Sequence, residues 1–113
     1  MYHSNLRVVD ENDVFYRNAH IEPQIAKNKY ECLVGLSATG CTIVYNRALA
    51  QLVHGRIPDK YSMHDTFLYN MASLCGKVIY DFQPHIDYRQ HANNSVGTYL
   101  DKKSINVYFK QLC

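Results

Sequence analysis

Alternating hydrophobic and polar residues mark the first elements of the chain. Residues 5–10 and 14–16 are two β-prone runs, and the turn formers of residues 11–13 separate them. Two such runs joined by a short turn predict a β-hairpin. Beyond Pro23 the apolar positions change to a rough helical spacing that ends at Gly35, which predicts a helix. The apolar positions of this helix are Ile25, Ala26, Tyr30, Leu33 and Val34.

The middle of the chain predicts two helices after a loop of small residues. Residues 37–40 carry little side-chain bulk, so their backbone is able to approach a ligand closely. Residues 41–45 follow as a short apolar strand, and Asn46 is a suitable N-cap for the first helix. Ser62 is a suitable cap for the second helix, which should end at Gly76. The residues that this second helix should bury are Phe67, Leu68, Met71, Ala72 and Cys75.

A period of two returns after the second helix. Residues 78–82 predict a strand that ends before Pro84, and residues 86–91 predict another. The tail from Ser104 again keeps its apolar residues at helical spacing. Strands mixed with helices indicate an α/β or α+β fold class, of which we expect α/β. In the last predicted strand, Asp87, Arg89 and His91 share one face.

Size, charge and cysteine content narrow the class of protein. A chain of 113 residues, 47% hydrophobic and 19% charged, fits one globular domain. The net charge of +2 is too small, and the basic residues too scattered, to favour nucleic acid as a partner. No apolar run is long enough for a membrane span. The four cysteines show no close pairing, which predicts reduced and mostly buried thiols in a cytoplasmic protein.

Three segments carry side chains suited to chemistry, and each has a plain structural alternative. The backbone amides of residues 37–40 are suited to bind phosphates or hydroxyls, unless the segment is only a turn. Asp65 is suited to accept a proton from an attacking hydroxyl, unless it only caps its helix and complements the helix dipole. Arg89 is suited to bind a carboxylate or a phosphate and His91 to bind a metal or a phosphate, unless both belong to a surface strand with a salt bridge. Taken singly, each residue favours the structural alternative.

Several short motifs nevertheless follow one another in a characteristic order. They are Ser4-Asn5-Leu6-Arg7-Val8-Val9-Asp10, Ala38-Thr39-Gly40-Cys41-Thr42, Tyr45-Asn46-Arg47-Ala48-Leu49, Met63-His64-Asp65, Gly76-Lys77-Val78-Ile79-Tyr80 and Tyr88-Arg89-Gln90-His91-Ala92-Asn93-Asn94-Ser95-Val96-Gly97. In order and spacing this set resembles the acceptor-side half of bacterial family 2 glycosyltransferases, especially the rhamnosyltransferase-like branch. The resemblance covers the chain except for its tail.

The resemblance implies an inverting transfer of a sugar from a nucleoside-diphosphate donor to a glycan or lipid-linked acceptor, in the synthesis of bacterial surface polysaccharide. It implies a partial GT-A-type fold, C-terminal half only, and a divalent ion, manganese or magnesium, that neutralises the leaving diphosphate. It makes Asp65 the base that deprotonates the acceptor and His91 a metal ligand. The substrate-binding residues that it implies are Thr39, Gly40, His64 and Arg89.

The chain departs from the family pattern in two ways. Thr66 stands before Phe67, where the family commonly has bulky aromatic residues directly after the His-Asp pair. An Asp-x-Asp metal motif and the opening nucleotide-binding strand are also missing. We therefore expect residues 1–97 to be the catalytic-base half of a transferase domain, residues 98–113 to begin a helical extension, and the isolated chain to be inactive.

The alternative is a non-catalytic module that binds a glycan or a protein. A strand edge left without its missing half would favour self-association. If the amphipathic tail contacts lipid, the transferase would act at the inner face of the membrane. If the tail is instead a helix of the core, the enzyme would be cytoplasmic without membrane contact.

Overall fold

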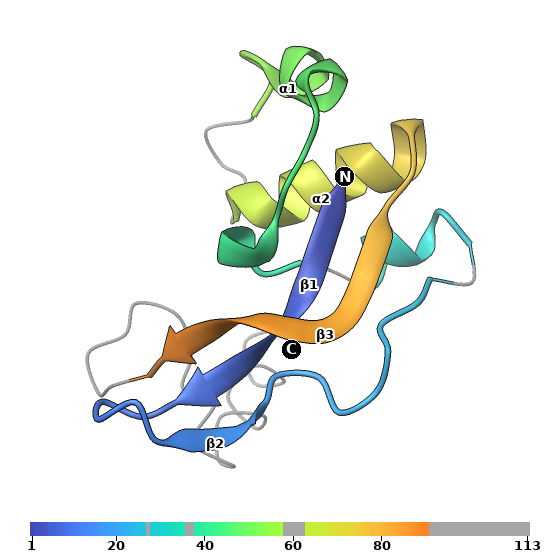
Figure 1. The fold of residues 1–113 in the computed structure, drawn as a ribbon. Helices are drawn as coiled ribbons and strands as arrows, with labels where there is room; N and C mark the ends of the chain where they lie inside the picture. The colour runs from blue at the N-terminus through green and yellow to red at the C-terminus, as the bar shows by residue number, and fades with distance from the viewer. Residues whose placement is uncertain (27, 36–37, 58–62, 91–113) are drawn as a thin grey trace, which may run out of the picture.

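The protein, described here by a computed structural model, is a small α/β domain with a three-stranded mixed sheet and two helices (Figure 1). The structure describes residues 1–26, 28–35, 38–57 and 63–90. β1 (Tyr2–Val9) is the central strand; β2 (Phe15–Asn18) pairs with it antiparallel and β3 (Ile79–Arg89) pairs with it parallel. This confirms the predicted α/β class.

The β1–β2 hairpin is confirmed, with strands longer than predicted. Its turn is closed by the carboxylate of Asp10, whose Oδ1 accepts hydrogen bonds from the backbone N–H groups of Asn12 and Val14, both at 2.9 Å. Asp13 adopts a left-handed backbone with φ of 64°, a conformation that aspartate tolerates better than most residues.

The prediction of two strands around Pro84 was wrong, because β3 runs through the proline. Pro84 lies opposite Asn5, and the register of the β1–β3 pair shifts on both sides of that position. In the sheet formed by the described residues β3 pairs with β1 alone, so it is an edge strand there, where a residue without an N–H group is tolerated. The alternation beyond the proline is as predicted: Asp87 and Arg89 are exposed, and Gln90 is buried.

The described residues after Pro23, 24–26 and 28–35, do not form the predicted helix. That stretch contains one short 3₁₀ turn, η1 (Glu31–Leu33), and its side chain at Cys32 is buried. Ile25 and Val34 are 72% and 84% exposed, so these apolar side chains do not pack against the core and do not stabilise a helix there. The strand predicted for residues 41–45 was also wrong: residues Gly40–Thr42 form a second 3₁₀ turn, η2, and Val44 makes an isolated bridge to Tyr2.

Both helices of the middle segment are confirmed. α1 (Arg47–Val53) is capped as predicted, because the Asn46 side chain accepts a hydrogen bond of 3.1 Å from the N–H of Leu49. α2 (His64–Cys75) ends at Gly76. The Ser62 cap that was predicted for α2 lies outside the described residues, and Met63 occupies the N-cap position without a side-chain hydrogen bond.

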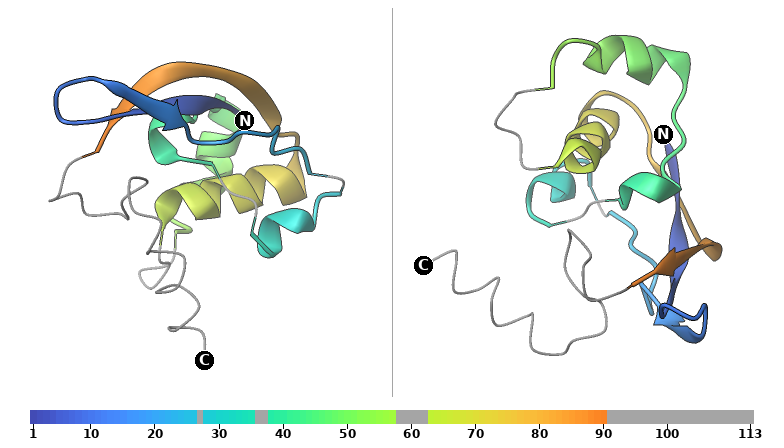
Figure 2. Two further views of the ribbon diagram at one scale, coloured as in Figure 1. Left: turned by 90° about the horizontal axis from the view of Figure 1, so that it is seen from below. Right: turned by 90° about the vertical axis from the view of Figure 1, so that its left-hand side faces the viewer.

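The core lies between α1, α2 and one face of the sheet (Figures 1 and 2). Leu68 and Ala72 of α2 are buried against Leu49 and Val53 of α1. Tyr69 joins Cys32 and Ala38 in a second cluster. Of the residues predicted to point inward from α2, Phe67 and Met71 are partly buried, but Cys75 is exposed.

A buried asparagine ties β2 to β1. The Asn5 side chain is fully buried; its Oδ1 accepts hydrogen bonds from the N–H groups of Leu6 and His20, at 2.9 and 3.1 Å. Its Nδ2 donates to the carbonyl oxygen of His20 at 2.8 Å. The side-chain amide of Asn5 therefore pairs with backbone groups of Leu6 and His20 near the irregular part of β1, where regular strand pairing is interrupted.

Candidate functional site

The N-terminus of α2 brings together three of the predicted site residues. Gly40 begins η2, and His64 and Asp65 are the first two residues of α2. The Gly40 N–H donates to Oδ2 of Asp65 at 3.1 Å, and the N–H of Thr66 donates to Oδ1 at 2.8 Å. Two backbone donors thus fix the orientation of one carboxylate. A carboxylate has about four lone-pair positions, so acceptor capacity remains on both oxygens.

Gly40 lies next to the side chains of both His64 and Asp65, at a distance where a small side chain would make ordinary van der Waals contact. A Cβ atom placed on Gly40 would lie 3.4 Å from Nε2 of His64 and 3.5 Å from Oδ2 of Asp65. The glycine backbone therefore lies directly against both side chains. His64 is exposed and Asp65 is half-buried, so both remain accessible from solvent.

Thr39 contributes through its backbone. Its carbonyl oxygen accepts hydrogen bonds from the N–H of Thr42 at 2.9 Å and from the Thr42 hydroxyl at 2.8 Å. Thr42 is buried, so these bonds anchor the η2 turn to the core. Thr39 thus holds Gly40 in place against α2.

Cys41, the next residue of η2, is held in its thiol form. Burial raises its pKa, and the nearby carboxylate of Asp65 raises it further, against a backbone hydrogen bond that lowers it. A thiol nucleophile needs the thiolate form. The site is therefore one of carboxylate and imidazole chemistry, with Cys41 as a neutral neighbour. Cys32, Cys41 and Cys75 are free thiols, and of these three only Cys32 is buried as predicted; Cys113 lies outside the described residues.

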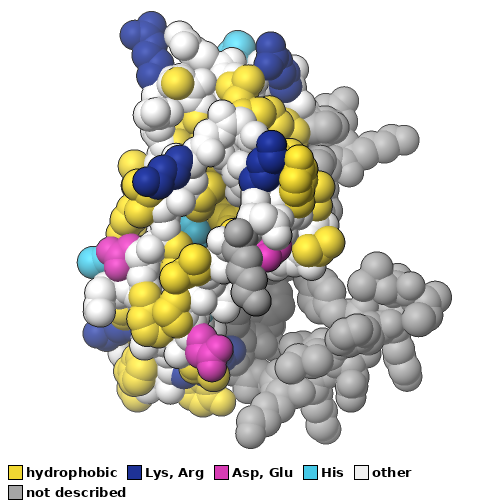
Figure 3. Space-filling view, turned by 90° about the vertical axis from the view of Figure 1, so that its right-hand side faces the viewer, with side chains coloured by type: hydrophobic (Ala, Val, Ile, Leu, Met, Phe, Trp, Pro, Cys, Tyr) yellow, Lys and Arg dark blue, Asp and Glu magenta, His cyan; other side chains and the backbone are white. Residues whose placement is uncertain are grey.

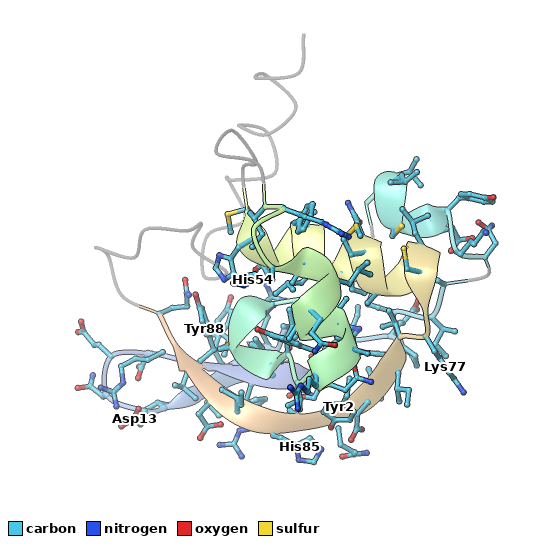
Figure 4. The ribbon with its side chains drawn as sticks, turned by 90° about the horizontal axis from the view of Figure 1, so that it is seen from above. Tyr2, Asp13, His54, Lys77, His85 and Tyr88 are labelled. Atoms are coloured by element: carbon cyan, nitrogen blue, oxygen red, sulfur yellow. The ribbon has the colours of Figure 1, made fainter. Side chains whose placement is uncertain are left out.

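Arg89 lies apart from this group. It forms a bidentate ion pair with Asp13 at the hairpin turn, with Nη2 at 2.7 Å from Oδ1 and 2.8 Å from Oδ2. Figure 4 shows Asp13 at one end of the sheet and Lys77 at the other. Arg89 therefore locks the end of β3 to the β1–β2 turn, which is a structural contact. The predicted metal ligand His91 lies outside the described residues.

Within the described part of the chain, no group of three or more His, Cys, Asp or Glu side chains is arranged to hold a metal ion. Asp65 and His64 are two such groups at one place, which is fewer than a metal site of protein ligands requires. Among the same residues, no helix has the length and apolar character to cross a membrane.

A buried cluster that the sequence pattern did not single out lies on the sheet. The ring of His3 is 2% exposed, packs edge-on against Tyr69 of α2 at 5.5 Å, and lies 4.8 Å from the ring of Tyr80. Burial, and to a lesser degree His20, lowers the pKa of His3 to about 4. Neither Nε2 of His3 nor the Tyr80 hydroxyl has a hydrogen-bond partner among the residues that the structure describes. The alternation of residues 2–6 alone gives no sign of this cluster.

Comparisons with protein-family models, with curated proteins and with solved structures found no match to this chain. The function must therefore be inferred from the chemistry of its own residues.

Proposed function

We propose that the chain is the acceptor side of an inverting, GT-A-type glycosyltransferase in which Asp65 is the catalytic base. The observation that supports this most is the hydrogen bond from the Gly40 N–H to Oδ2 of Asp65. It joins two motifs 25 residues apart in sequence, and those are the motifs to which the resemblance assigns the acceptor loop and the base.

The proposed reaction uses the free lone pairs of the Asp65 carboxylate. An acceptor hydroxyl donates its proton to Asp65 while its oxygen forms a bond to the anomeric carbon of the donor sugar. The bond from that carbon to the diphosphate breaks at the same time, and the diphosphate leaves with the electron pair. A divalent ion held by the donor half of the enzyme would neutralise the diphosphate. His64, exposed beside Gly40, is positioned to bind a sugar hydroxyl.

The test is sugar transfer by the complete protein that contains this chain, assayed with a panel of nucleoside-diphosphate sugars. Replacement of Asp65 by Asn should lower turnover by orders of magnitude and leave donor binding nearly unchanged. Asp87→Asn is the matched control, because Asp87 is an exposed aspartate that pairs with Arg7 on the sheet. Near-normal turnover in Asp65→Asn would make Asp65 a helix-terminus residue only.

A second candidate, a non-catalytic interaction module, is favoured by apolar side chains on the edge strands. Phe15 and Tyr16 of β2 are 53% and 50% exposed, and Ile79 of β3 is 53% exposed. Figure 3 shows further apolar side chains among polar ones on the surface. Sedimentation would distinguish the candidates: a module that self-associates should become monomeric in Phe15→Lys or Ile79→Lys, whereas a monomeric wild-type chain would count against it.

A further inference from the structure

A cavity of about 350 Å³ lies at the opposite end of α2 from Asp65. Its walls come from α1 and its N-cap residue, from the last two turns of α2, from the turn that follows α2, from Met1 just before β1, and from Ile79 at the start of β3. α2 has 12 residues, so its two ends lie about 16 Å apart at the usual helical rise. The cavity is thus separate from the candidate transferase site.

The lining of the cavity combines apolar side chains with two polar ones, Asn46 and Lys77, and several of the apolar residues are small. Ala48, Ala72 and Gly76 line it with little bulk, and Leu49, Leu52 and Met71 supply larger apolar surfaces. An engineered apolar cavity of about 150 Å³ is large enough to bind benzene. A space more than twice that size lies in the range of natural pockets for small molecules, which begins near 300 Å³.

The charges at the cavity select the kind of ligand. Among the described residues, Lys77 is the one charged side chain in the lining and no acidic residue lines the cavity. The N-terminal ammonium of Met1, also in the lining, is a second positive group and donates a hydrogen bond of 2.9 Å to the carbonyl oxygen of Lys77. Lys77 lies in the turn between α2 and β3 and is exposed (Figure 4). Its ammonium group has no ion-pair partner among the residues that the structure describes. An apolar ligand with a negatively charged end would place its chain against the leucines and its charge near Lys77.

We propose that this cavity binds a single-chain amphiphile with an anionic head group, such as a medium-chain fatty acid. Burial of the chain supplies most of the affinity, since each buried CH₂ group contributes about 0.8 kcal/mol. Lys77 sets the preference for an anion over a neutral or cationic head group. The proposal does not depend on the transferase function, because none of the residues involved belongs to the Gly40–Asp65 site.

The three methionines of the chain allow a direct test with decanoate below its micelle concentration. Met1 and Met71 line the cavity, whereas Met63 precedes α2 at its other end. In protein labelled with ¹³C at the methionine methyl groups, decanoate should shift the Met1 and Met71 signals saturably and leave Met63 in place. The absence of any shift, or equal shifts at all three, would overturn the proposal.

Two variants test the chain and head-group contacts. Ala48→Phe fills the cavity and should abolish the saturable shift, whereas Ala50→Phe, on the same helix but outside the lining, should not. Lys77→Glu should weaken decanoate binding about tenfold or more, and Lys29→Glu, at a lysine over the Tyr30 ring, should leave it unchanged. Decanol that binds the wild type as tightly as decanoate does would refute the anionic preference, whether or not the variants fold.

Discussion

His3 should make the stability of the domain depend on pH in a way that one substitution removes. The imidazole is buried between Tyr69 and Tyr80, and its pKa is lowered from 6.5 to about 4, first by burial and then by His20. In the unfolded chain His3 takes up a proton near pH 6.5. Between pH 6.5 and 4 the unfolded state therefore binds more protons than the folded state, and the free energy of unfolding falls as the pH is lowered.

The size of the effect follows from the two pKa values. A difference of one pKa unit corresponds to about 1.36 kcal/mol, so the full change from 6.5 to about 4 amounts to about 3 kcal/mol. Near pH 5 the slope due to His3 approaches about 1.4 kcal/mol per pH unit. The free energy of unfolding of a whole domain is usually about 5–15 kcal/mol, so this loss is a large fraction of it.

His3→Phe keeps an aromatic ring against both tyrosines and removes the titrating group. Urea unfolding, followed by tyrosine fluorescence at several pH values from 4 to 7.5, gives the free energy of unfolding of each protein. The difference between wild type and His3→Phe should change by about 3 kcal/mol between pH 7 and pH 4. Any packing cost of the phenylalanine acts equally at all pH values, so it cancels from that change.

His54→Phe serves as the control, because His54 is an exposed histidine at the end of α1. Its stability should follow the wild-type pH dependence in parallel. His20, whose pKa is also lowered by burial and then by Arg17, keeps its own contribution in both variants. If the His3→Phe and wild-type curves run parallel from pH 4 to 7.5, His3 is not buried in its neutral form, and the reasoning fails.

Three further substitutions test individual contacts by urea unfolding. Asn46→Ala removes the side-chain acceptor for the Leu49 N–H and should cost about 1 kcal/mol; no change would show that the cap is not made. Leu68→Ala empties part of the α1–α2 core and should cost about 2–5 kcal/mol, and a cost below about 1 kcal/mol would mean that the two helices do not pack as described. Arg89→Gln breaks an exposed ion pair with Asp13 and should cost at most about 1 kcal/mol, whereas a larger cost would give Arg89 a role beyond that pair.

Elements with local signals were predictable from the sequence. The Asn46 cap, the stop at Gly76 and the hairpin turn at residues 11–13 each depend on neighbouring residues, and each is present. The failures have a common cause in long-range packing. Helical spacing around Ile25 predicts a helix only if a surface exists to cover it, and Ile25 is exposed.

The course of β3 shows the same limit. A proline ends a strand when its missing N–H would be needed by a neighbour, and within the described sheet Pro84 has a neighbouring strand, β1, on one side only. Whether a strand lies at an edge is a property of the whole sheet. The parallel pairing that places Tyr2 opposite Ile79 likewise joins the two ends of the described chain, and no local pattern encodes it.

The candidate site was predictable in part. The sequence identified Gly40, His64 and Asp65 as candidate site residues. The contact between them depends on how η2 packs against the start of α2. Arg89 was assigned to substrate because its type suits a phosphate, yet a carboxylate that is distant in sequence, that of Asp13, occupies its guanidinium. Residue type therefore identified possible chemistry, and tertiary contacts determined which residues share a site.

The Asn5 side chain has a consequence for how the sheet opens. Its single amide holds the N–H groups of Leu6 and His20, although Asn5 and His20 are 15 residues apart in sequence. One rotation of that side chain releases both groups together. In hydrogen exchange, the amides of Leu6 and His20 should therefore become exposed in one shared opening event and show similar protection factors. The end of the hairpin remote from its turn would then detach as a single cooperative unit.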